Sequence, residues 1–135
     1  MHKTFARLTL KSNLMDPEEI KRELPILAEI YKAGDIIETK YSSSIKTQKS
    51  NRWVYSLESF ENENINSVIK RIYRDVAPYK AKFIEYTHKF HAMLDIVVYY
   101  DLEKITISHN TSLTKTSLNI LSELNVKLNI SIFDW

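Results

Sequence analysis

The chain has 135 residues and a formal net charge of +2, with 19 lysine and arginine residues against 17 aspartate and glutamate residues. It contains no cysteine and a single glycine, which excludes disulfides, thiolate metal sites and glycine-rich phosphate loops. The length is that of one domain, so we expect a single domain over residues 1–135, and no motif predicts a cofactor.

No segment of the sequence has the pattern of a membrane protein. The longest apolar run, Ile96 to Tyr100, is far shorter than the roughly 20 residues that span a bilayer. Residues 1–7 lack the long apolar stretch of a secretory signal. We therefore expect a cytoplasmic protein without a membrane partner.

The first predicted elements are a strand and a helix. Residues 4–11 alternate in character with the period of a half-buried strand. Asp16 can cap a helix that begins at Pro17, since its side chain accepts hydrogen bonds from free N–H groups. Pro25 lacks an N–H and clashes with the preceding turn, so the helix should end or kink just before it. The apolar stripe expected for this helix is Ile20, Leu24 and Leu27.

The next stretch predicts a turn, a loop and a second long strand. Gly34-Asp35 favours a turn, with a short extended segment at residues 36–37. Residues 41–51 are polar and have no period, which predicts a solvated loop. Residues 53–58 alternate again and place Trp53 and Tyr55 on one face of a strand.

A helix and a long strand follow. Apolar residues at helical spacing after Asn64 predict an amphipathic helix that Pro78 closes, and residues 79–87 add another turn or two. From Phe90 to Tyr100 the period changes to two. One face of this strand should carry Ala92, Leu94, Ile96, Val98 and Tyr100, and the other His91, Met93, Asp95, Val97 and Tyr99.

The last part of the chain completes an α+β pattern. Residues 105–108 can form an antiparallel hairpin with the preceding strand. Ser112 or Thr114 can cap a third helix that carries Leu118, Leu121 and Leu124, and residues 126–133 alternate as a final strand. The order β-α-β-α-β-β-α-β favours a two-layer, ferredoxin-like sandwich, with a mixed, largely antiparallel sheet and helices on one face.

Several segments together resemble a bacterial family known as domain of unknown function 4279. They are Leu14-Met15-Asp16-Pro17-Glu18-Glu19-Ile20, Gly34-Asp35, Asn51-Arg52-Trp53-Val54-Tyr55-Ser56-Leu57-Glu58, and the strand-helix-strand from Ile105 to Phe133. The chain departs from the family pattern at Pro25 and Ala28, where a glycine and a proline are expected. The resemblance implies the fold and no established activity, although some small bacterial domains of this kind serve as immunity or interaction proteins.

Histidine residues provide the candidate chemical sites. His88, His91 and Asp95 would share a metal ion only on a helix, because in a strand His91 lies roughly 13 Å from Asp95. His109 precedes a predicted helix, so it belongs either to an anion site or to a capping turn. An alternative function is a small enzyme that uses His91 and Asp95, or His109, as acid–base groups. We predict no catalytic residue and no metal site.

The basic and aromatic residues offer a further alternative, nucleic-acid binding. Lys40, Lys46, Lys49 and Arg52 lie beside Tyr41 and Trp53, a combination that can bind single-stranded nucleic acid. The net charge is small and the strand motif of RNA-recognition domains is absent, so ordinary solvation is the better interpretation. A nucleic-acid partner is not expected.

The leading hypothesis is a binding or interaction module that acts through a sheet face, with a protein partner or self-association by the same surface. If helices cover only one face, side chains among Trp53, Tyr55, Met93, Val97 and Tyr99 form an apolar surface for a partner. We favour a core position for Trp53 and leave Tyr99 open. The candidate binding residues are Arg52, Trp53, Tyr55, His91, Asp95, Tyr99 and His109.

Overall fold

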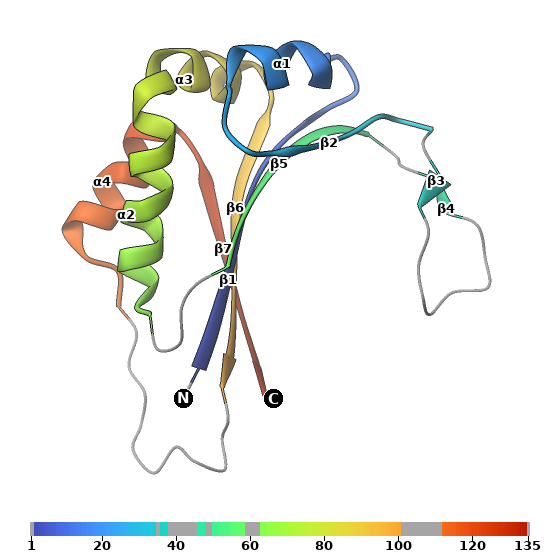
Figure 1. Ribbon diagram of the computed structural model, residues 1–135. Helices are drawn as coiled ribbons and strands as arrows, with labels where there is room; N and C mark the ends of the chain where they lie inside the picture. Colours follow the sequence, from blue (N-terminus) through green and yellow to red (C-terminus); the bar gives the residue numbers. More distant parts are fainter. Residues whose placement is uncertain are drawn as a thin grey trace.

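The computed structural model describes residues 2–34, 36–37, 46–47, 50–58, 63–100 and 112–134. They form an α+β fold in which helices lie on one side of a mixed five-stranded sheet (Figure 1). The sheet order is β2-β5-β1-β6-β7, and a separate pair consists of β3 and β4. The strands are β1 (His2–Ser12), β2 (Glu29–Tyr31), β3 (Ile36–Ile37), β4 (Lys46–Thr47), β5 (Asn51–Glu58), β6 (His91–Tyr100) and β7 (Lys127–Asp134). The helices are α1 (Pro17–Glu23), α2 (Ile65–Val76), the 3₁₀ turn η1 (Ala77–Tyr79), α3 (Lys80–Lys89) and α4 (Lys115–Leu124).

The central strand β1 determines the sheet's topology. It pairs antiparallel with both β5 and β6, so Phe5 lies opposite Glu58 on one side and Val97 on the other. β7 pairs parallel to β6, because the chain returns through α4 before it enters β7. The sheet is therefore mixed rather than largely antiparallel, and the strand order does not confirm the ferredoxin-like arrangement. The hairpin predicted at residues 105–108 lies outside the described residues.

One face of the sheet and the helices enclose a single apolar core. Every second residue of the long strands points toward the helices, as the alternation predicts. The buried strand residues on this covered face are Thr4, Ala6, Leu8, Leu10, Trp53, Tyr55, Ala92, Leu94, Ile96 and Val98. Helix residues Ile20, Ile69, Phe83 and Leu121 pack in the same cluster.

The helix boundaries agree with the capping residues in the sequence. The carboxylate of Asp16 accepts hydrogen bonds from the backbone N–H groups of Glu18 and Glu19, and Asn64 and Thr114 cap α2 and α4. α1 ends at Glu23, before Pro25. Because the helix stops there, Leu27 does not continue its stripe and is 95% exposed, contrary to our expectation.

Two further expectations need correction. Leu118 is 51% exposed, since the buried stripe of α4 runs through Ser117, Ile120, Leu121 and Leu124. The region expected as a loop, residues 41–51, contributes β4 and the first residue of β5. The rest of that region lies outside the described residues, except for Ser50, which is buried.

Asparagine side chains join segments that are distant in sequence. Asn66 at the start of α2 accepts hydrogen bonds from the Thr114 N–H and the Ser117 hydroxyl, and it donates one to the Ser112 carbonyl. Asn51 accepts from the Ala33 N–H and donates to the Met15 carbonyl. These bonds fix the entry of α4 against α2, and the start of β5 against the turns beside it.

The strands curve as they pass over the helices, so the face away from the helices is concave (Figure 1). None of the described helices is long and apolar enough to cross a bilayer.

Candidate functional site

The face of the sheet opposite the helices, here called the open face, carries the other set of alternating side chains. No described helix covers it (Figure 1). Its side chains come from β2, β5, β1, β6 and β7, in the order in which these strands lie in the sheet. They are Glu29, Tyr31, Arg52, Val54, Ser56, Glu58, Lys3, Phe5, Arg7, Thr9, Lys11, His91, Met93, Asp95, Val97, Tyr99, Lys127, Asn129, Ser131 and Phe133.

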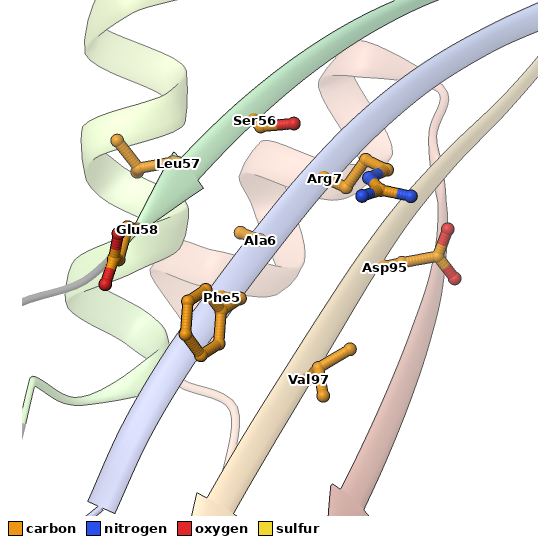
Figure 2. A pocket seen from close by; sticks show the side chains of 8 residues that line it. All are labelled: Phe5, Ala6, Arg7, Ser56, Leu57, Glu58, Asp95 and Val97. Carbon is orange, nitrogen blue, oxygen red and sulfur yellow. The ribbon is translucent and has the colours of Figure 1, made fainter. Parts of the chain in front are cut away.

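A hollow of about 600 Å³, here called the Arg7 hollow, lies on this face across β5, β1 and β6 (Figure 2). Half-buried Phe5 and Val97 are neighbours on β1 and β6 and give it an apolar floor. Arg7 lies two residues further along β1, opposite Ser56 of β5 on one side and Asp95 of β6 on the other. The residues that line the hollow are Phe5, Ala6, Arg7, Ser56, Leu57, Glu58, Asp95 and Val97.

The charged groups of the hollow are not paired with one another. Arg7 is exposed and, in the described part of the chain, makes no ion pair with a carboxylate. Asp95 lies directly opposite Arg7 in the register, but its carboxylate accepts a hydrogen bond from the Asn129 amide at 3.0 Å. The guanidinium of Arg7 is therefore available to an anionic group from outside.

A second, smaller hollow of about 200 Å³ adjoins the first, and the two share Arg7 and Ser56. Its lining also includes Arg52, Thr9, Val54, Glu29 and Tyr31. The Tyr31 hydroxyl donates a hydrogen bond to Glu29 at 2.5 Å, and this bond, followed by burial, raises the pKa of Tyr31. The positive charge of Arg7 opposes that rise in pKa, which places Arg7 within electrostatic reach of both hollows.

Two of the sequence-predicted site residues belong to the core. Trp53 is fully buried on the covered face, with its ring 6.3 Å from that of Phe83, which confirms the core position favoured for it. Tyr55 is buried on the same face, and its hydroxyl donates a hydrogen bond to Asp75 of α2. Burial and this bond raise the pKa of Tyr55. Both residues attach helices to the sheet and do not reach the open face.

Four other predicted residues do lie on the open face: Arg52, His91, Asp95 and Tyr99. Arg52 donates a hydrogen bond from Nε to the Ser50 hydroxyl at 3.3 Å. Tyr99 forms an aromatic row with rings on the two neighbouring strands, 5.8 Å from Phe5 in an edge arrangement and 5.6 Å from Phe133 in a stacked one. This row borders the Arg7 hollow through Phe5.

The histidines are not brought together with Asp95. His88 lies near the end of α3, and His91 begins β6 and lines a separate hollow of about 330 Å³ between β6 and α4. Asp95 lines the Arg7 hollow instead. Among the described residues, no three His, Asp or Glu side chains gather closely enough to hold a metal ion. His109 lies outside the described residues.

Comparison with known proteins identifies a family. The family described as Domain of unknown function (DUF4279) matches residues 2–135. The chain belongs to the DUF4279 family. This confirms the resemblance drawn from the sequence segments. No curated protein and no solved structure matches the chain.

The segments that suggested the DUF4279 family have structural roles in this chain. Asp16 caps α1, Gly34 adopts a positive φ of 92° in a turn, and Asn51 joins β5 to the turns beside it. A glycine tolerates that φ without the strain that a Cβ would cause. The matched segments therefore serve the fold, and the open face is the surface left to explain.

The centre of this DUF4279 domain's open face, Arg7, was not among the predicted site residues. The alternation at residues 4–11 places Arg7 and Phe5 on the polar side of β1. That pattern contains no information about which strands lie beside β1, and so the hollow could not be assembled from it. Glu58 and Ser56 were missed for the same reason.

The nucleic-acid alternative receives no structural contribution from Trp53, because its ring is inside the core and cannot stack on a base. Lys40, Tyr41 and Lys49 lie outside the described residues. Arg52 is the basic residue of that group whose side chain the structure describes, and it belongs to the open face.

Proposed function

We propose that this DUF4279 protein is a binding module whose open face accepts a segment of a protein partner, with the Arg7 hollow at the centre of the contact. One observation carries the proposal: a hollow of about 600 Å³ combines an apolar floor with a guanidinium that has no ion-pair partner in the described part of the chain. Concave sites with an apolar lining and a few polar groups are the usual form of binding sites.

The residue types on this face support a protein partner. Arginine and aromatic side chains are enriched at the centres of protein interfaces, where they contribute most of the binding energy. Here Arg7 lies beside Phe5, and Phe5 begins the aromatic row with Tyr99 and Phe133. Rigid rings lose little conformational entropy when a partner covers them.

Charge complementarity indicates the chemistry of the partner segment. Arg7 would pair with a carboxylate, and the floor formed by Phe5 and Val97 would bury an apolar side chain beside it. Glu58 and Asp95 also line the hollow and would favour a basic group next to that apolar side chain. We therefore expect a short partner segment that carries acidic, apolar and basic side chains together.

The experiment compares partner capture by three forms of the full chain. Tagged wild-type protein, the Arg7→Glu variant and the Lys70→Glu variant are each incubated with native lysate of the source organism. Lys70 is an exposed residue of α2, so Lys70→Glu makes the same charge reversal away from the open face. Retained proteins are identified and quantified by mass spectrometry.

We expect a partner retained by wild type and by Lys70→Glu but lost by Arg7→Glu. With the purified partner, Arg7→Glu should raise Kd about tenfold or more, as substitution of a central interface arginine does. Equal retention by wild type and Arg7→Glu would contradict the proposal. So would a wild-type chain that retains nothing beyond the tag control.

A further inference from the structure

The outer edge of β7 is a second surface with a definite chemistry. β7 lies at the end of the sheet and, among the described strands, pairs only with β6. Along the side away from β6, the backbone N–H and C=O groups of the eight residues of β7 have no strand partner among the described residues. Such an edge is a template for another strand unless the sequence protects it.

Apolar side chains border this edge on the side of the helices. Ile130 and Ile132 point to the covered face, as shown by their pairing with Ile96 and Val98, yet they are 39% and 65% exposed. Leu118 of α4 is exposed as well. The β7 edge is defined here as the backbone of β7 together with Leu118, Ile130 and Ile132.

Leu118 of α4 faces away from α2. Glu123 of α4 accepts a hydrogen bond from Tyr73 of α2, so that flank of α4 faces α2. α2 is attached by the hydrogen bond from Tyr55 to Asp75 to β5, and the central strand β1 separates β5 from β6 and β7. Leu118 lies about 140° around the helix from Glu123, at 100° per residue, and so points away from α2.

The opposite edge of the sheet shows what protection looks like. β2 has only three residues, two of which, Glu29 and Tyr31, are exposed on the open face, and an exposed ion pair between Lys32 and Glu18 follows it. Short length and nearby charge discourage pairing with another strand. β7 is longer and, among its described side chains, carries a charge only on Lys127 at its start.

We propose that the β7 edge binds the β7 edge of a second copy of this chain, through antiparallel pairing about a two-fold axis at Ile130. Two identical strands that keep their covered faces on the same side can pair only with residues of equal parity opposite each other. Centred on Ile130, Leu128 lies opposite the second copy's Ile132, and Asn129 lies opposite its Ser131. Lys127 lies opposite Phe133, so no like charges face each other.

This register makes the second copy the natural occupant. Leu128, Ile130 and Ile132 of the two strands then form one apolar strip. Exposed apolar area is thereby buried on both copies, and the free backbone groups of both edges are satisfied. The inference does not depend on the proposed function, because the open face takes no part in the contact.

The first test measures the mass of the full chain by sedimentation velocity over a range of concentrations. We expect the wild-type mass to rise to twice that of the monomer. Ile132→Lys should remain monomeric, because its ammonium group would face Leu128 of the second copy. Ile132 is largely exposed, so the variant should fold, which circular dichroism checks. Tyr31→Lys makes the matched change at the β2 edge and should leave the dimer intact.

The second test uses the absence of cysteine in the natural chain to determine the register. Two-fold pairing at Ile130 places Ile130→Cys opposite itself, so mild oxidation should give a covalent dimer. Two copies of Ile132→Cys would lie about 13 Å apart along the strands, beyond the reach of a disulfide. That variant should remain uncrosslinked on a non-reducing gel.

The outcomes separate this proposal from the function proposed for the open face. A wild-type chain that stays monomeric up to high micromolar concentration would overturn it, as would a dimer that survives Ile132→Lys. Crosslinking of Ile132→Cys without crosslinking of Ile130→Cys would overturn it too. Arg7→Glu, which tests the open face, should dimerise like wild type.

Discussion

The covered and open faces are built from the same strands, yet their side chains differ in burial and in polar partners. On the covered face, the hydroxyl of Tyr55 on β5 donates a hydrogen bond to Asp75, and Leu8 and Leu10 of β1 are buried. One residue away in sequence, Arg7 is exposed in a hollow and has no ion-pair partner among the described residues. Alternation along a strand therefore places buried core residues and the residues of the proposed binding surface next to each other in sequence.

The comparison also shows that the two faces tolerate change differently. A covered residue contributes through area removed from water and through close packing, so its loss leaves a cavity. A residue of the open face already contacts water, and its loss changes the surface more than the stability. The following predictions test this difference.

The largest effect is expected for Trp53. Trp53→Ala should lower the free energy of unfolding by about 3–5 kcal/mol, because it removes a fully buried ring that contacts Phe83. Denaturant unfolding followed by circular dichroism measures the change. Val97→Ala on the open face is the matched truncation and should cost much less.

Trp53→Phe refines this comparison. The buried Nε1–H of Trp53 has no hydrogen-bond partner among the described residues, so phenylalanine keeps an aromatic ring while removing that polar group. It should therefore be far milder than Trp53→Ala. If Val97→Ala were as destabilising as Trp53→Ala, the claim that the covered face contributes more to stability than the open face would be wrong.

An intermediate effect on stability is expected from the carboxylates of Glu23 in α1 and Glu123 in α4. The hydrogen bond from Tyr86 lowers the pKa of Glu23, and the bond from Lys80 lowers the pKa of Glu123. Both carboxylates bind fewer protons in the folded state than in the unfolded state. Their stabilising effect is therefore present above the ordinary pKa of 4.5 and lost as the pH falls through the folded-state values.

The double variant Glu23→Gln, Glu123→Gln should consequently lose less stability than wild type on acidification, as measured by urea unfolding at neutral and acidic pH. Glu58→Gln on the open face is the control, because Glu58 makes no ion pair in the described part of the chain. Its acid profile should match that of wild type. Identical profiles for the double variant and wild type would contradict the assignment of acid sensitivity to Glu23 and Glu123.

The smallest effect on stability is expected for Arg7. Arg7→Gln should change the free energy of unfolding by no more than about 0.5 kcal/mol, the range of surface substitutions without special contacts. Thermal and denaturant unfolding of the variant and of wild type provide the measurement. A loss of several kcal/mol would mean that Arg7 holds the sheet together and is not reserved for a ligand.

Much of the fold could be predicted from local patterns. The alternation of β1, β5, β6 and β7 and the caps Asp16, Asn64 and Thr114 are local signals, and the structure confirms them. β2 was not predicted, since a strand of three residues is too short to display a period. The stripe of α1 was extended to Leu27 because helical spacing continues in the sequence after the helix has ended.

The site was harder to predict because it depends on contacts between distant segments. Arg7, Ser56 and Asp95 meet only because β1 lies between β5 and β6, and no single segment records that order. The parallel pairing of β7 with β6 was likewise not predicted, because local patterns favoured a hairpin after β6 and do not indicate which strand β7 joins. Alternation correctly assigned Asp95 and Tyr99 to one face of β6, whereas the location of the hollow required the order of strands in the sheet.

The position of β1 at the middle of the sheet also has a kinetic consequence. Phe5 pairs with Glu58 of β5 on one side and with Val97 of β6 on the other. Both pairings of the central strand therefore join segments that are far apart along the chain. Such non-local pairing slows folding, since the entropy of closing long loops is lost before the stabilising contacts form. During synthesis on the ribosome, the apolar side of β1 emerges before β5 and β6, so it stays without its partners until they follow.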